Sequence, residues 1–137
     1  MASFQVRTPF LLLLVGMILL ALAFSVFFSL PTRYLLVHVT VPDAETSDKI
    51  ARELIDAKLA ACINVLPVQS KYRWDGEYKE SSELLMLIKT RASLFHDVSQ
   101  HIRQLHPAEL PEIIGVSVDK GLFEYLEWVR TSTRPPY

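Results

Sequence analysis

The sequence is poor in cysteine and glycine. A single cysteine, Cys62, in 137 residues excludes an intrachain disulfide framework, an all-cysteine zinc site and an iron–sulfur cluster held by one chain. The CxxC motif that a copper chaperone needs is also missing. Four glycines and eight prolines do not amount to a low-complexity composition, so most of the chain is expected to fold.

An excess of basic residues is missing as well. The 14 Lys and Arg residues are balanced by 15 Asp and Glu residues, for a net charge of −1, whereas nucleic-acid binding usually needs a basic face. The strand expected at 34–41 carries only Tyr34 as a stacking aromatic, although RNA-binding sheets place several on their central strands. We therefore expect no nucleic-acid partner.

The sequence also contains no recognisable set of catalytic residues. No Ser/His/Asp or Cys/His arrangement stands out along the chain. The loop expected at 41–45 carries Asp43 and Glu45, and their negative charge would repel a phosphate group. These observations predict that the protein is not an enzyme.

Charge is scarce at the N-terminus, where Arg7 and Arg33 are the only charged side chains among the first 33 residues. Residues 10–30 are almost entirely apolar, and as a helix they would reach about 31 Å, close to the thickness of a hydrocarbon core. We predict a flank at 1–9, a transmembrane signal anchor at 10–30 and a linker at 31–33. The protein would then be a single-pass membrane protein with its domain in the lumen or outside the cell. A cleaved signal peptide and a secreted domain are the alternative.

The remaining chain alternates between strand-like and helix-like patterns. Branched and continuous apolar residues predict strands at 34–41, 61–74, 84–88 and 112–118. Apolar residues at helical spacing predict helices after Asp43, at 94–105 and at 122–130. The βαββαβ order with a C-terminal helix predicts a ferredoxin-like α/β (α+β) sandwich over 34–134, followed by a tail at 135–137.

Asp75-Gly76 is the strongest local signal in the chain. An Asp-Gly link between two strand-like runs predicts a type I′ hairpin turn, and this turn places Lys71 opposite Glu80 as a favourable charge pair. Pro67 predicts a bulge or an edge position in the second strand. The same register pairs Trp74 with Glu77, Arg73 with Tyr78, Leu66 with Leu85 and Ile63 with Ile88.

The hairpin is long for a domain of this size. An extended arm over 61–74 would span about 46 Å at about 3.3 Å per residue. Its tip carries the large side chains of Tyr72, Trp74 and Tyr78. We expect this arm to dock on another subunit, and the alternative is a solvated tip with exposed aromatic rings.

Several short motifs follow one another in a specific order over 34–133. They are Thr40-Val41-Pro42, residues 58–64 (KLAACIN), residues 72–76 (YRWDG), Ile88-Lys89-Thr90, His106-Pro107, Pro111-Glu112 and residues 125–128 (YLEW). As a set they resemble the CutA-type divalent-cation-tolerance proteins, of which animal members often carry an N-terminal hydrophobic segment. The resemblance implies a homotrimer built through the long hairpins, copper(II) binding and a role in metal-ion tolerance. By analogy with mammalian members it also implies a link to acetylcholinesterase.

The candidate metal ligands are His106 and Cys62. Copper(II) prefers imidazole and carboxylate ligands, and thiolate suits copper(I). Bacterial relatives carry a cysteine at the position of Val39 and a histidine pair where this chain has Leu105 and His106, so His106 alone is retained. His106 is equally expected to cap a helix end, and Cys62 to be a small core residue. We expect His96 and His101 on the surface and His38 as a hydrogen-bonded core histidine.

A second candidate site is a cleft between subunits. Relatives line that cleft at the positions of Lys89, Glu112, Tyr125 and Trp128, although each of these side chains could also serve packing. Two functions therefore stay open. One is a trimer that binds divalent metal ions, and the other is a trimeric scaffold or small-ligand-binding module at a secretory membrane.

Overall fold

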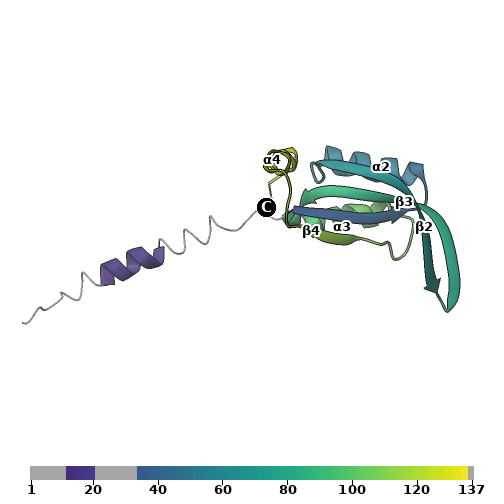
Figure 1. Ribbon diagram of the computed structural model, residues 1–137, viewed down its shortest axis with the longest axis horizontal. Coiled ribbons are helices and arrows are strands. Elements are labelled where there is room, and N and C mark those ends of the chain that lie inside the picture. Colours follow the sequence, from purple (N-terminus) through teal and green to yellow (C-terminus); the bar gives the residue numbers. More distant parts are fainter. Residues whose placement is uncertain (1–11, 21–33, 136–137) are drawn as a thin grey trace, which may run out of the picture. The chain divides into compact units, whose positions relative to one another are not determined.

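The computed structural model describes residues 12–20 and 34–135. The chain divides into two compact units, Met1–Pro31 and Thr32–Tyr137. In the first unit residues 12–20 are helical (Figure 1). The rest of the predicted span at 10–30, the flank at 1–9, the linker at 31–33 and the end of the tail lie outside the described residues. Among the described residues, no helix is long and apolar enough to cross a membrane, so they do not support the predicted N-terminal spanning helix.

The second unit has the predicted βαββαβ order and ends in a further helix. Its elements are β1 (Tyr34–Val41), α2 (Ala44–Asp56), β2 (Cys62–Trp74), β3 (Glu77–Arg91), the short 3-10 helix η1 (Ala92–Leu94), α3 (Phe95–Leu105), β4 (Ile114–Val118) and α4 (Phe123–Ser132). The four strands form one antiparallel sheet in the order β2-β3-β1-β4. Strand β3, whose residues 84–88 are continuously apolar, is therefore internal.

One face of the sheet carries the hydrophobic core. Alternate residues of β1 point to this face, and Val37, Val39 and Val41 are fully buried there. Helices α2 and α3 cover the same face with apolar side chains at helical spacing. The core contributed by these two helices consists of Ile50, Leu54, Val98 and Ile102.

Helix α2 begins where the sequence predicts it. The carboxylate of Asp43 accepts a hydrogen bond of 2.7 Å from the backbone N–H of Thr46, which satisfies one of the free donors of the first turn. This hydrogen bond lowers the pKa of Asp43. Asp43 therefore terminates β1 and starts α2 within two residues of Val41.

The β2–β3 hairpin is continuous from end to end. Asp75 and Gly76 have φ angles of 50° and 78°, as a type I′ turn requires. All the predicted cross-strand pairs are confirmed, including Lys71 with Glu80. Pro67 pairs with Leu84 without a slip in register, so the predicted bulge is wrong. β2 is the edge strand, and an edge is where a strand tolerates a proline.

The opposite face of the sheet lacks such a cover over much of its area. Residues paired across an antiparallel sheet share a face, and the pairs here are Leu36 with Val116 and His38 with Ile114. Val116 and Ile114 are 46% and 51% exposed. His38 is half-buried on this face, so the prediction of a core histidine is wrong.

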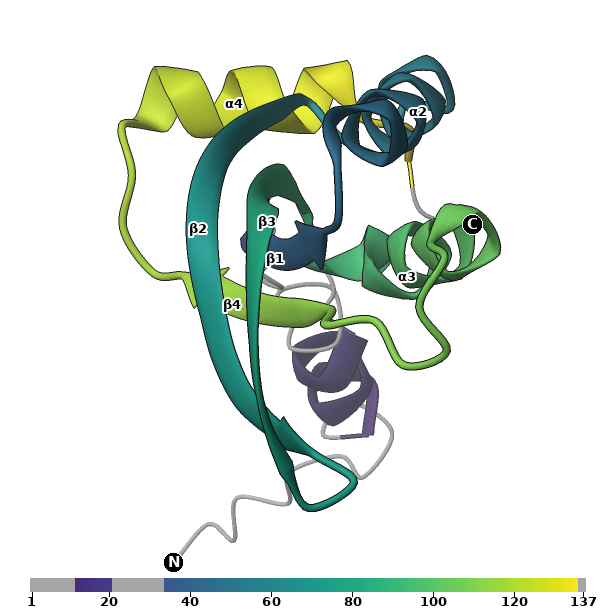
Figure 2. The ribbon, with the colours of Figure 1, turned by 90° about the vertical axis from the view of Figure 1, so that its right-hand side faces the viewer.

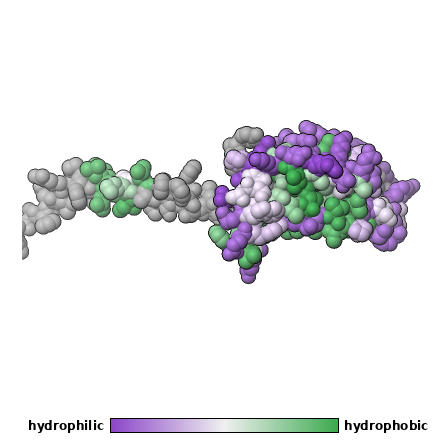
Figure 3. All heavy atoms as spheres, turned by 90° about the horizontal axis from the view of Figure 1, so that it is seen from above, coloured by the Kyte–Doolittle hydropathy of each residue, from purple (hydrophilic) through white to green (hydrophobic). Residues whose placement is uncertain are grey.

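Helix α4 lies at the end of the sheet where β2 begins, away from α3 (Figure 2). Arg91 at the end of β3 holds it there: its Nε donates to Thr133 Oγ1 over 3.0 Å and its Nη2 to the Thr133 carbonyl over 3.2 Å. Seen from above, apolar residues reach the surface of the domain between hydrophilic borders (Figure 3). The domain thus exposes apolar side chains in addition to those buried in its core.

Candidate functional site

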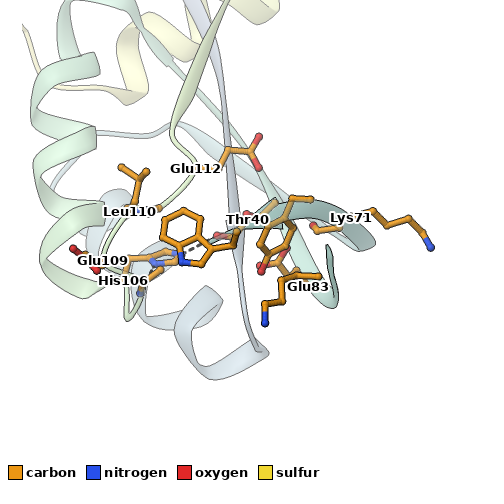
Figure 4. A pocket seen from close by; sticks show the side chains of 13 residues that line it. Thr40, Lys71, Glu83, His106, Glu109, Leu110 and Glu112 are labelled. Atoms are coloured by element: carbon orange, nitrogen blue, oxygen red, sulfur yellow. Dashed lines mark hydrogen bonds between the residues drawn. The ribbon is translucent and has the colours of Figure 1, made fainter. Parts of the chain in front are cut away.

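A cavity of about 610 Å³ lies between the hairpin and the segment that joins α3 to β4. We call it the hairpin groove. Its lining comes from the end of β1, from the distal half of the hairpin and from residues 106–112 (Figure 4). The lining residues are Thr40, Ser70, Lys71, Tyr72, Trp74, Lys79, Glu83, His106, Ala108, Glu109, Leu110, Pro111 and Glu112.

His106 connects the segment 106–112 to strand β1 of the sheet. It is the C-cap residue of α3, as one reading of the sequence predicted. Its Nε2 lies 2.8 Å from the Thr40 carbonyl oxygen, and its Nδ1 accepts from the Ala108 N–H over 3.1 Å. Since a carbonyl only accepts, Nε2 is the donor of this hydrogen bond. Both ring nitrogens are therefore used inside the chain.

A copper site made of His106 and Cys62 within one chain does not fit this geometry. A metal at Nδ1 would displace the Ala108 N–H, and Nε2 holds a proton. Cys62 pairs with Lys89, which pairs with Leu36, whereas His106 contacts Thr40. Four residues along β1 separate the two positions, or about 13 Å. No group of three His, Cys, Asp or Glu side chains able to hold a metal occurs within residues 12–20 and 34–135.

Cys62 is half-buried at the start of β2, so it is not the fully buried core residue that the sequence favoured. The Lys89 amine lies 3.8 Å from its Sγ and also donates to Asn64 Oδ1. Burial, with a smaller contribution from the neighbouring Cys62 thiol, raises the pKa of Tyr125. Because the Lys89 ammonium group repels metal ions, its position beside the Cys62 thiol disfavours Cys62 as a metal ligand.

The structure separates the four residues predicted for the inter-subunit cleft. Lys89 and Tyr125 both lie beside Cys62, and the rings of Tyr125 and Trp128 are 5.4 Å apart. Glu112 instead lines the hairpin groove. Within a single chain these residues therefore form two sites.

The predicted interface aromatics are also divided. Tyr72 and Trp74 line the hairpin groove and are 46% and 47% exposed. Tyr78 is more exposed, and its hydroxyl donates to Glu80 over 2.7 Å. This hydrogen bond raises the pKa of Tyr78, and the Lys71 ammonium lowers the pKa of Glu80. The side chains of Thr40, Glu83 and Leu110 complete the groove without having been predicted from the sequence.

The comparison with known families decides the relationship. Residues 35–132 match the family model described as CutA1 divalent ion tolerance protein. The chain belongs to the CutA1 family. Its similarity to relatives lies in the second unit, where it is 42% identical over 98 residues to the divalent-cation tolerance protein CutA of Thermus thermophilus, covering 71% of this chain and 95% of that protein.

Longer relatives share the same region with this CutA1-family chain. It is 41% identical over 101 residues to protein CutA, chloroplastic, of Arabidopsis thaliana, covering 73% of this chain and 56% of that protein. It is 43% identical over 96 residues to human protein CutA, and the match covers 69% of this chain and 54% of that protein. The match thus spans about half the length of these relatives.

Solved CutA1 structures have the same fold. The crystal structure of CutA1 from Oryza sativa has a TM-score of 0.73 at 38% identity and covers 75% of this chain and 95% of that one. The structure of the Thermus thermophilus protein has a TM-score of 0.72 at 40% identity and covers 74% of this chain and 99% of that one. Since the second unit matches essentially the whole Thermus chain, it is expected to fold by itself.

Proposed function

We propose that this CutA1-family protein acts in tolerance of divalent metal ions as a homotrimer. Membership of the CutA1 family supports the role, and the observation that supports assembly is the apolar sheet face opposite α2 and α3. Leu36, His38 and Thr40 of β1 lie on it beside Leu87, and Ile114 and Val116 flank them on β4. An apolar sheet face is stable when it is buried against another layer, and three copies in a closed ring can cover one another's uncovered faces.

The energetics favour assembly through this face. Burying a Val, Leu or Ile side chain contributes about 1.5–3 kcal/mol, and each copy offers several that are about half exposed, including Leu66, Ile114 and Val116. The aromatic rings at the hairpin tip add further apolar area. A closed symmetric assembly gains these contributions at every interface.

The mass of residues 32–137 in solution tests the trimer. We expect a trimer at micromolar concentration, and a stable monomer would contradict the proposal. Ile114→Glu places a charge on the uncovered face at a position that is half exposed in the single chain, so it should dissociate the assembly and leave each chain folded. Leu122→Glu is the matched control, because Leu122 is 71% exposed just before α4, outside both the sheet and the hairpin groove. Trp74→Ala should weaken assembly as well.

Copper(II) is the cation that the family resemblance implies. Because His106 and Cys62 cannot meet in one chain, we propose that any copper site is shared between chains of the trimer. Titration of the trimer with copper(II) above and below pH 6 tests this, since imidazole must be neutral to bind a metal. Affinity that survives in both His106→Ala and Cys62→Ser would remove these two residues as ligands.

The second candidate is a trimeric small-ligand-binding module or scaffold without physiological metal binding and without enzymatic activity. Two observations favour it: both ring nitrogens of His106 are engaged, and a cavity of about 610 Å³ lies beside them. Ligand pockets usually have volumes of about 300–1,000 Å³. A copper titration without heat or spectral change on an intact trimer would favour this candidate.

A further inference from the structure

We propose that the domain rests on the surface of a lipid bilayer through Leu122 and Phe123, at the start of α4. The inference rests on the predicted membrane anchor at 10–30 and goes beyond the proposed assembly and metal tolerance. It draws on three features: the exposure of this apolar pair, its place in the fold and the short connection that joins β1 to the apolar run.

The first feature is that the pair departs from local structural preferences. Leu122 and Phe123 are 71% and 72% exposed, and among the large apolar side chains described in the second unit only Leu110 is as exposed. Leu122 is also the N-cap residue of α4 and makes no side-chain cap hydrogen bond, although Ser, Thr, Asp or Asn there would stabilise the helix. Departures from local preference are expected at functional positions.

The second feature is the position of the pair beside the point where the chain enters the sheet. Tyr34, the first residue of β1, pairs with Val118, the last residue of β4, so the loop that leads to α4 leaves the sheet next to Tyr34. Glu127 and Arg130 share a face of α4 with Phe123. Burial and the Glu127 charge raise the pKa of Tyr34, and Arg130 opposes them. This face of α4 therefore lies on the side of Tyr34.

The same face is distinct from the one beside the apolar sheet face that the proposed trimer buries. Tyr125 lies next to Cys62, and its ring is 5.4 Å from the ring of Trp128. At about 100° per residue, Phe123 is about 200° around the helix from Tyr125 and about 140° from Trp128. Phe123 is therefore directed away from the two rings that border the proposed interface.

The third feature is the length of the connection. Three residues, 31–33, join the apolar run at 10–30 to Tyr34, and the four Cα-to-Cα steps from Leu30 reach at most about 14 Å. With the run inserted in a bilayer, this covalent length keeps Tyr34 near the membrane surface, together with the neighbouring start of α4. Apolar side chains of surface-bound elements enter about 5–10 Å into the boundary between headgroups and acyl chains.

The charges around the pair indicate which lipid it contacts. Asp119, Lys120 and Glu124 flank it, so it lacks the cluster of basic residues that binds anionic lipids. Anionic lipids give the cytoplasmic leaflet its negative surface potential, whereas this domain is predicted to lie on the lumenal or outer side. The surface that matches the pair is therefore a zwitterionic one, such as phosphatidylcholine.

Fluorescent probes on the full chain in phosphatidylcholine vesicles test the proposal. Cys62→Ser removes the only thiol, and a nitrobenzoxadiazole label is then attached at Phe123→Cys or at Leu110→Cys. Leu110 is the matched control, because it is also 72% exposed and precedes β4 at the opposite end of the sheet. We expect lipids with nitroxide-labelled acyl chains to quench the probe at position 123 and to leave the probe at position 110 unchanged.

A probe at Glu124→Cys leaves the apolar pair intact and tests the pair directly. Its quenching should be lost in Phe123→Glu, which places a charge at the lipid boundary, and retained in Phe123→Leu. Leu110→Glu is the control for the added charge and should not change the quenching. Thermal melts of each variant verify that it is folded.

In chains that sediment with the vesicles, equal quenching at positions 123 and 110 would overturn the proposal, as would no quenching at position 123. Quenching at position 124 that survives Phe123→Glu would overturn it too. A chain that does not sediment with the vesicles would refute the predicted anchor and this inference together. The mass of the assembly is measured after detergent extraction of the same samples, and a monomer there refutes the proposed trimer alone.

Discussion

His106 illustrates how a single side chain can have its chemistry decided by its neighbours. An isolated imidazole is a good ligand for copper(II), but this ring donates to Thr40 and accepts from Ala108. It thereby fastens the segment 106–112 to the end of β1, which shapes the hairpin groove. In this chain we regard His106 as a residue that positions the groove wall.

Replacement of His106 by alanine should therefore reduce stability. The loss of two hydrogen bonds at about 0.5–1.5 kcal/mol each is expected to lower the free energy of unfolding by about 1–3 kcal/mol, measured by urea denaturation of residues 32–137. His96→Ala serves as the control, because His96 is exposed on α3 and should have little effect. Equal stability of both variants would show that the His106 contacts contribute nothing.

Asp43 provides a pH-dependent test at the same scale. Its pKa is lowered in the folded state by the hydrogen bond from the Thr46 N–H. A group with a lowered pKa stabilises the fold above its unfolded pKa of about 3.9, and this stabilisation is lost as the pH falls through the folded value. Asp43→Ala should therefore be less stable than the natural chain at pH 7, and the difference should shrink below about pH 3.9.

Asp43→Asn separates the cap from the charge. Asparagine is also a good N-cap residue, so this variant should keep helix α2 and lose the pH dependence that Asp43 contributes. Urea unfolding at pH 7 and at about pH 2.5 measures both effects. A difference between Asp43→Ala and the natural chain that is the same at both pH values would rule out the carboxylate as its source.

At the scale of elements, the long hairpin follows almost completely from its sequence. The Asp75-Gly76 turn sets the register, and apolar pairs such as Ile63 with Ile88 keep it along the whole ladder. The hairpin groove could not be predicted in this way. It depends on residues far apart in the sequence, from the hairpin and from 106–112, lining one cavity, and the lining residue Glu83 carries no local pattern that marks it.

Burial on the two faces of β1 was likewise only partly predictable from the sequence. Val37, Val39 and Val41 were predicted to form part of a buried strand because such β-branched residues favour it. His38 was expected in the core because it lies inside the same strand, whereas only one face of that strand is packed against α2 and α3. Coverage of a sheet face is a property of the tertiary structure that a single strand does not encode.

The turn at Gly76 offers a test of the hairpin as an element. Its φ angle of 78° lies in the left-handed region, where a side chain costs about 1–2 kcal/mol. Gly76→Ala should destabilise the domain by about that amount, measured as a shift in the urea midpoint. Asp75→Asn is the control, because asparagine tolerates a positive φ angle. A Gly76→Ala variant as stable as the control would mean that the turn relaxes freely.

At the scale of the whole molecule, the apolar run at 10–30 carries the remaining prediction. We expect the full-length protein to stay in the membrane fraction, because this largely apolar run of 21 residues would reach about 31 Å as a helix. Alkaline carbonate extraction measures retention, and protease digestion of intact vesicles measures the side. Release into the soluble fraction with a new N-terminus near Pro31 would show a cleaved signal peptide. Digestion of the domain in intact vesicles would reverse the expected topology.

Pro67 on the edge strand β2 has a consequence for solubility. A thirteen-residue edge presents unpaired backbone groups on which other chains could stack into amyloid-like fibrils. Since its pairing with β3 is unbroken, the missing N–H of Pro67 interrupts the outward row of donors, and the charges of Lys71 and Arg73 hinder stacking farther along. We therefore expect Pro67 to keep this long edge strand from templating fibril growth.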